Sequence, residues 1–95
     1  MKKILLMAVL ASAMTNVFAS SDAAWEALYA RTEKACLKKS NLNDPQVVGE
    51  RIVFGKHILY RVEGIYPQAH MQGKKGSVYC LHPYPKGRPE IADVP

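Results

Sequence analysis

Apolar and polar residues alternate with a helical period in one early stretch of the chain, residues 22–39. In this stretch, apolar or small side chains recur at the three- and four-residue intervals of one helix face, at Trp25, Leu28, Tyr29, Thr32 and Cys36. Ser21 suits the N-cap, and Asn41, after Ser40, suits the end because Asn tolerates left-handed backbone. The pattern therefore predicts an amphipathic helix over 22–39.

Three stretches with strand character follow, at 47–54, 57–66 and 77–82. A period of two places Ile58, Tyr60 and Val62 on one face of the second stretch, and Val78 and Cys80 on one face of the third. These elements predict an α+β fold: one N-terminal amphipathic helix packed on a small antiparallel sheet of three strands or slightly more.

The connections between these stretches carry turn residues. Asn43-Asp44-Pro45 predicts a turn, Gly49 a bulge, and Gly55-Lys56 a two-residue hairpin of type II′. The connection 66–76 is long for so small a domain, and long connections are often functional. Residues 83–95 contain too many prolines for a central strand and predict an extended, partly mobile tail.

The first residues have the three parts of a secretory signal peptide. Two lysines follow Met1, residues 4–13 are uncharged and apolar, and Val17-Phe18-Ala19 precedes Ser20 with small or short residues at the cleavage positions. The apolar run is shorter than the roughly 20 residues that span a bilayer. We therefore expect residues 1–19 to be cleaved and the mature protein to be exported, in the style of a Gram-negative periplasmic protein, without a membrane span.

Cleavage would leave 76 residues with 11 basic and 8 acidic side chains. Such a mildly basic, exported chain gives no reason to expect nucleic-acid binding. Both cysteines, Cys36 and Cys80, remain after cleavage, and in an oxidising compartment they predict one disulfide. The domains expected are the signal peptide 1–19, a disulfide-bonded domain 20–82 and the proline-rich tail 83–95.

Catalytic and metal-binding chemistry finds little support in the residue pattern. The histidines His57, His70 and His82, with Met71 beside the second, lack the spacing of a copper site. No nucleophile elbow or carboxylate pair is present, and Gly73-Lys74-Lys75-Gly76 lacks the Ser/Thr and helix of a phosphate-binding loop. We expect no catalytic residue, no metal and no cofactor.

Protein binding is the remaining expectation. The long connection combines aromatic, cationic and thioether side chains, which are common at interfaces, and Tyr84 lies between two prolines in the tail. An inward-folded connection that covers the core, and a frayed tail, are the alternatives. The candidate contacts are Tyr66, Pro67, Gln68, His70, Met71, Lys74, Lys75 and Tyr84.

Several of these residues also carry a family resemblance. The segment from Tyr66 to Met71, with Gly73, Gly76 and Cys80-Leu81 after it, resembles a family of small exported proteobacterial proteins. The family shares a helix-borne cysteine and a glycine-led strand, here Ala35-Cys36-Leu37 with Ser40 and Leu42, and Gly49 with Ile52 and Phe54. The resemblance covers nearly all of the mature chain, and it implies a periplasmic accessory protein that stabilises the extended type IV pilus. It implies no ligand or catalytic residue.

Two other functions stay open at this point. Small disulfide-bonded exported domains often inhibit hydrolases, and Gly76-Ser77 with Tyr79 is similar, in changed order, to the Ser-Gly-x-x-Tyr loop of periplasmic lysozyme inhibitors. The chain is short for the barrel of those inhibitors. A copper-binding periplasmic protein is the third hypothesis.

Overall fold

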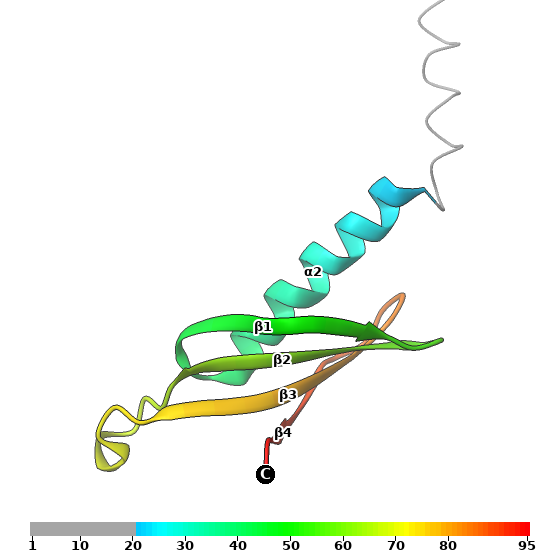
Figure 1. The fold of residues 1–95 in the computed structure, drawn as a ribbon. Coiled ribbons are helices and arrows are strands. Elements are labelled where there is room, and N and C mark those ends of the chain that lie inside the picture. Colours follow the sequence, from blue (N-terminus) through cyan, green and yellow to red (C-terminus); the bar gives the residue numbers. More distant parts are fainter. Residues whose placement is uncertain (1–20) are drawn as a thin grey trace, which may run out of the picture.

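One long helix and a four-stranded antiparallel sheet form most of residues 21–95 (Figure 1). The computed structural model describes residues 21–95, so the predicted signal peptide lies outside the described residues. The elements, in chain order, are α2 (Asp22–Ser40), β1 (Asn43–Val53), β2 (His57–Ile65), the short 3₁₀ helix η2 (Ala69–Met71), β3 (Lys75–Pro83) and β4 (Glu90–Asp93). The strands lie in the sheet in sequence order. The predicted α+β fold is confirmed.

Helix α2 begins and ends where the sequence predicts. The Ser21 hydroxyl accepts the Ala24 N–H at 3.4 Å, and Asn41 ends the helix in the left-handed conformation with φ of 61°. Thr32, Cys36 and Ser40 are buried on the face that meets the sheet. Leu28 and Tyr29, which lie about one turn before Thr32, are only partly buried, so the C-terminal half of α2 covers the core most closely.

The core lies between α2 and one face of the sheet. Ile58, Tyr60 and Val62 are completely buried on β2, and Val78 and Cys80 are buried beside them on β3, which confirms both predicted alternations. The Tyr60 hydroxyl reaches α2, where it lies 2.7 Å from the Thr32 hydroxyl. The predicted disulfide joins Cys36 to Cys80, with 5.8 Å between the two Cα atoms, and links the last turns of α2 to β3.

The structure changes two details of the sequence prediction and confirms a third. Asn43-Asp44-Pro45 lies within β1 as an irregularity in its register, with Asp44 at φ of 48°, and is not a separate turn. The hairpin at Gly55-Lys56 has the predicted length, but neither residue has positive φ, so the type II′ prediction is wrong. Gly49, at φ of 70° between register positions Val48 and Ile52, is the predicted bulge.

A fourth strand comes from the predicted tail. Residues 90–93 form β4, which pairs with β3 through Val78–Asp93 to Leu81–Glu90. Pro83 is the last residue of β3, and the other prolines of this region lie in the connection between β3 and β4 and after β4. Residues 90–93 themselves contain no proline and form an edge strand. The disulfide-bonded sheet therefore extends to residue 93, whereas the sequence placed the domain's end at residue 82.

Candidate functional site

The eight predicted contact residues lie at opposite ends of the sheet. Seven belong to the connection after β2 or to the first residue of β3, and Tyr84 follows β3 at its other end (Figure 1). Because β3 has nine residues at about 3.3 Å each, roughly 25 Å separates these two ends. The predicted residues therefore do not form one surface.

The connection Tyr66–Lys74 is held in one shape by its own backbone. The Tyr66 N–H donates to the Lys74 carbonyl at 3.0 Å, and within the connection the N–H groups of Met71, Gln72 and Lys74 donate to carbonyls three residues earlier. Gln72 and Gly73 take positive φ to close the turn. His70, Lys74 and Lys75 are exposed, as are Pro67 and Gln68, so this connection is accessible and ordered by overlapping turns.

Tyr66 packs against the sheet and is only partly exposed. A Cβ atom on Gly76 would lie 2.8 Å from the Tyr66 ring, so the ring lies directly over this buried glycine. Tyr66 also contacts the hydrophobic core, and Met71 is half-buried. The Tyr66 side chain therefore folds inward and covers the end of the core, as in the alternative given above.

Tyr84 is tied into the fold by both of its polar groups. Its N–H donates to the Lys56 carbonyl at 3.0 Å, and its hydroxyl donates to the Phe54 carbonyl at 2.6 Å. Its ring meets Trp25 edge-on at 5.9 Å, and Trp25 also contacts Tyr29. Arg31 donates to the Pro85 carbonyl at 2.9 Å. The segment after β3 thus joins the β1–β2 hairpin to α2.

A second surface, which the sequence analysis did not assign, lies on the sheet face away from α2. Leu59 pairs with Leu81, and Tyr79 pairs with Ala92, so these four side chains share the face opposite the core and form what we call the open-face patch. With Glu90 and Ile91 they line a shallow hollow of about 320 Å³. Tyr79 is 36% exposed. No helix of residues 21–95 covers this face.

The sequence contained a signal for this patch. The same period of two that places Val78 and Cys80 in the core places Tyr79 and Leu81 on the opposite face. One helix covers one face of a sheet, so apolar side chains on the other face are left exposed.

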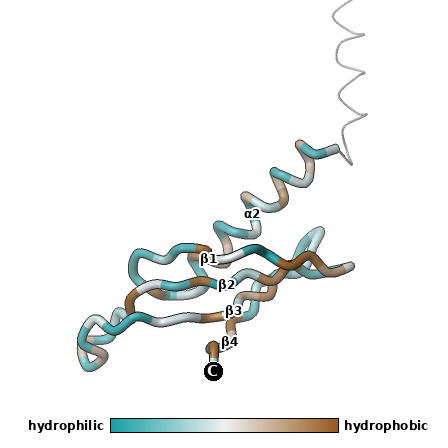
Figure 2. The backbone as a smooth tube through the Cα atoms, in the orientation of Figure 1, coloured by the Kyte–Doolittle hydropathy of each residue, from teal (hydrophilic) through white to brown (hydrophobic). Residues whose placement is uncertain are grey.

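A third apolar surface is the end of the β1–β2 hairpin. Its residues Ile52, Val53 and Phe54, here called the hairpin tip, are all exposed, and Figure 2 shows the apolar colour concentrated at this end of β1. The sequence places these three consecutive apolar residues in the predicted strand 47–54, and an apolar run in a strand does not by itself indicate that its side chains are exposed.

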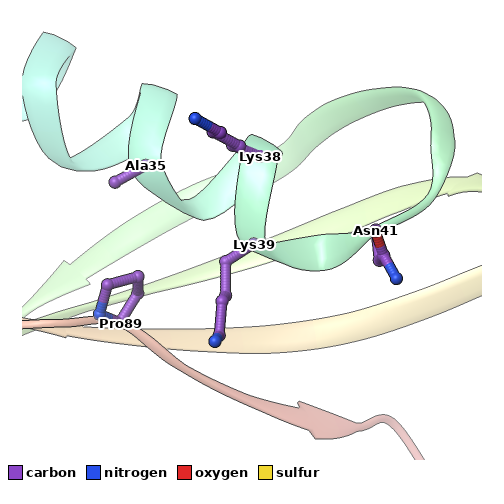
Figure 3. Close-up of a pocket in the computed structure, with 5 residues that line it drawn as sticks. All are labelled: Ala35, Lys38, Lys39, Asn41 and Pro89. Atoms are coloured by element: carbon purple, nitrogen blue, oxygen red, sulfur yellow. The ribbon is translucent and has the colours of Figure 1, made fainter.

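A pocket of about 470 Å³ lies between the end of α2 and the segment before β4, lined by Ala35, Lys38, Lys39, Asn41 and Pro89. Two lysines at one pocket suggest an anion site, but Figure 3 shows their side chains pointing in different directions, Lys39 along the pocket beside Pro89 and Lys38 away from it. This arrangement does not gather positive charge on one point. We assign the pocket no ligand.

The three histidines do not gather at one point. His57 and His82 are neighbours on the paired strands β2 and β3, but they belong to opposite faces of the sheet. His57 begins β2, His70 lies at the opposite end of the sheet, and His82 is buried with its Nδ1 atom 2.6 Å from the Pro83 carbonyl oxygen. Within residues 21–95, no three His, Cys, Asp or Glu side chains gather as a metal site would require. The described part of the chain also contains no helix long and apolar enough to cross a membrane.

The residues that resemble the lysozyme-inhibitor loop lie in a strand. Gly76 is buried under Tyr66, and the Ser77 hydroxyl accepts the Arg61 Nε–H at 3.1 Å within the sheet. Tyr79, two residues on, belongs to the open-face patch. The three residues therefore do not form a protruding loop.

The geometry of residues 21–95 offers surfaces for contact. Among residues 21–95, the one pKa that departs clearly from its ordinary value is that of Tyr60, which burial raises, against the opposing effects of its Thr32 hydrogen bond and of Arg51. Tyr60 is completely buried in the core and faces no pocket opening. In comparisons with protein-family models, with curated proteins and with solved structures, nothing matches this chain.

Proposed function

We propose that this protein is a non-enzymatic accessory protein that acts by binding another protein through the open-face patch. The observation that carries the proposal is the apolar character of a sheet face that no helix of the described residues covers. Exposed apolar patches that surround a hollow are characteristic of interaction sites, because a partner that covers them removes apolar surface from water. Tyr79 is a residue type enriched among the strongest interface contacts.

The compartment and the partner are part of the same proposal. A disulfide that links α2 to β3 is typical of proteins that fold in an oxidising compartment, which supports export to the periplasm. The family resemblance implies a partner in the type IV pilus system, and we adopt this as the specific function: support of pilus assembly or stability.

A deletion strain tests this function directly. We expect cells that lack the protein to lose extended surface pili, scored by electron microscopy, and to regain them when the wild-type gene is supplied. The same strain is exposed to lysozyme. Unchanged piliation together with increased lysozyme sensitivity would refute the pilus proposal and favour an inhibitor of hydrolases.

The exposed connection Tyr66–Lys74 is the competing contact surface. Replacing His70, Lys74 and Lys75 with Ala removes its exposed charged and imidazole groups and leaves Tyr66 in place over Gly76. If this variant fails to restore pili while a variant of the open-face patch restores them, the contact lies at the connection and not on the open face.

A further inference from the structure

The hairpin tip is exposed on both of its sides. Ile52 pairs with Leu59 on the open face, and Val53 pairs with Ile58 on the face that α2 covers further along the sheet. Yet Ile52, Val53 and Phe54 are 52%, 42% and 48% exposed. The hairpin projects past the other strands at this end of the sheet (Figure 1). A flat protein surface would bury only one side of this projecting hairpin. A lipid bilayer into which the hairpin inserts would bury both sides.

The tip is also held outward by its neighbours. The Phe54 N–H donates to the His57 carbonyl at 2.7 Å and closes the hairpin. Tyr84 adds two bonds, from its N–H to the Lys56 carbonyl and from its hydroxyl to the Phe54 carbonyl. Because these bonds fix the backbone, the apolar side chains stay exposed in water, and insertion needs no rearrangement.

The charged side chains of the tip's own segments are all cationic. The two segments that form this end, 51–57 and 83–89, contain four cations and no acidic residue; the cations are Arg51, Lys56, Lys86 and Arg88. Acidic residues of neighbouring elements approach one side of this end. Arg51 lies over the Tyr29 ring at 3.6 Å and shares a hollow with Glu33, Glu50 and Val53. Asp22 and Glu26 lie near the start of α2, where Trp25 contacts Tyr84. Cations beside exposed apolar side chains complement the headgroups of an anionic bilayer.

We propose that the hairpin tip inserts into the headgroup region of an anionic lipid bilayer, with the surrounding cations on the lipid phosphates. This membrane contact is a second activity, separate from protein binding by the open-face patch. The tip and the patch use different residues, so each can be removed alone.

Binding to vesicles tests the proposal. The purified, disulfide-bonded protein is sedimented with vesicles of equal parts phosphatidylglycerol and phosphatidylcholine, and with vesicles of phosphatidylcholine alone. We expect binding to the anionic vesicles, reduced by at least about tenfold at high salt because screening weakens the ionic contacts. Phe54→Asp should reduce binding by about tenfold or more, since a Phe side chain gains at least that factor from full burial.

A charge-matched pair of variants separates a local contact from attraction by net charge. Lys56→Gln with Lys86→Gln, at the tip, should weaken binding strongly, whereas Lys38→Gln with Lys39→Gln, at the end of α2, should weaken it little. Thermal unfolding is measured for every variant to check that it is folded.

Three results would overturn the proposal. They are absence of binding to anionic vesicles, wild-type binding by folded Phe54→Asp, and equal effects of the two lysine pairs. If Phe54→Asp abolishes pili and wild-type protein ignores vesicles, the tip is instead a protein contact. Loss of pili in an open-face variant that still binds vesicles bears on the proposed function alone.

Discussion

Removal of the disulfide should destabilise the protein more than any change at its surface. Cys36 and Cys80 are separated by 44 positions, and the cross-link restricts the unfolded chain. For a loop of that length the chain-entropy relation gives about 4 kcal/mol at 25 °C. A domain of this size has a total free energy of unfolding of about 4–11 kcal/mol, so the cross-link is a large share of it.

The expected change in melting temperature follows from the size of the chain. At about 2.1 cal/mol/K per residue, the unfolding entropy of the 75 described residues is about 0.16 kcal/mol/K, and a loss of 4 kcal/mol lowers the Tm by roughly 25 °C. The change is best made as Cys36→Ala with Cys80→Ala, because Ala introduces no buried hydroxyl or free thiol at these two completely buried positions.

The assay compares thermal unfolding of wild type and variant, each with and without a reducing agent. Reduction should lower the Tm of wild type toward that of the variant and leave the variant unchanged. Val78→Ala, which removes two buried methyl groups beside Cys80 without changing the cross-link, shows the cost of lost packing alone. A difference of less than about 5 °C between wild type and the Ala variant would refute the reasoning, because the cross-link would then contribute little.

Two further changes test the packing of the core. Tyr60→Phe should lower the free energy of unfolding by about 1 kcal/mol, because it removes the hydroxyl that contacts Thr32. Because burial raises the Tyr60 pKa, the native state holds this proton more tightly than the unfolded chain does, and wild-type stability should fall as pH rises above about 10. Urea unfolding at pH 9 and pH 11 should show a smaller fall in the variant. Gly76→Ala should lower the free energy of unfolding by about 1–3 kcal/mol, because the new Cβ atom would overlap the Tyr66 ring. Gly55→Ala is the control and should lower it much less, because a Cβ atom there would have no other atom within 4 Å. Equal melting temperatures for the two variants would contradict this account of the connection.

The sequence predicted the elements that depend mainly on residues close together in the chain. Ser21, the helical spacing and Asn41 determined the limits of α2, and the alternation in β2 identified its three buried residues. The disulfide followed from the presence of only two cysteines.

The remaining features depend on contacts between distant segments. Residues 90–93 have too little local strand signal to predict β4, which exists because β3 offers an unpaired edge. Tyr66 and Tyr84 are each followed by a proline, yet their ring contacts with Gly76 and Trp25 come from the packing of the sheet ends. For the same reason the predicted contact residues are divided between two ends. The period of two already placed Tyr79 and Leu81 on one face, but only the strand register placed Leu59 and Ala92 beside them.

The central claim is that the open-face patch contacts the protein's partner. The most direct test supplies a deletion strain with Tyr79→Thr and Leu81→Thr together, which replaces two apolar side chains of the patch with a residue type that suits strands. The connection variant with Ala at His70, Lys74 and Lys75 serves as the comparison, and protein levels are matched. We expect the patch variant to leave the cells without extended surface pili and the connection variant to restore them; normal piliation by a folded patch variant would contradict the claim.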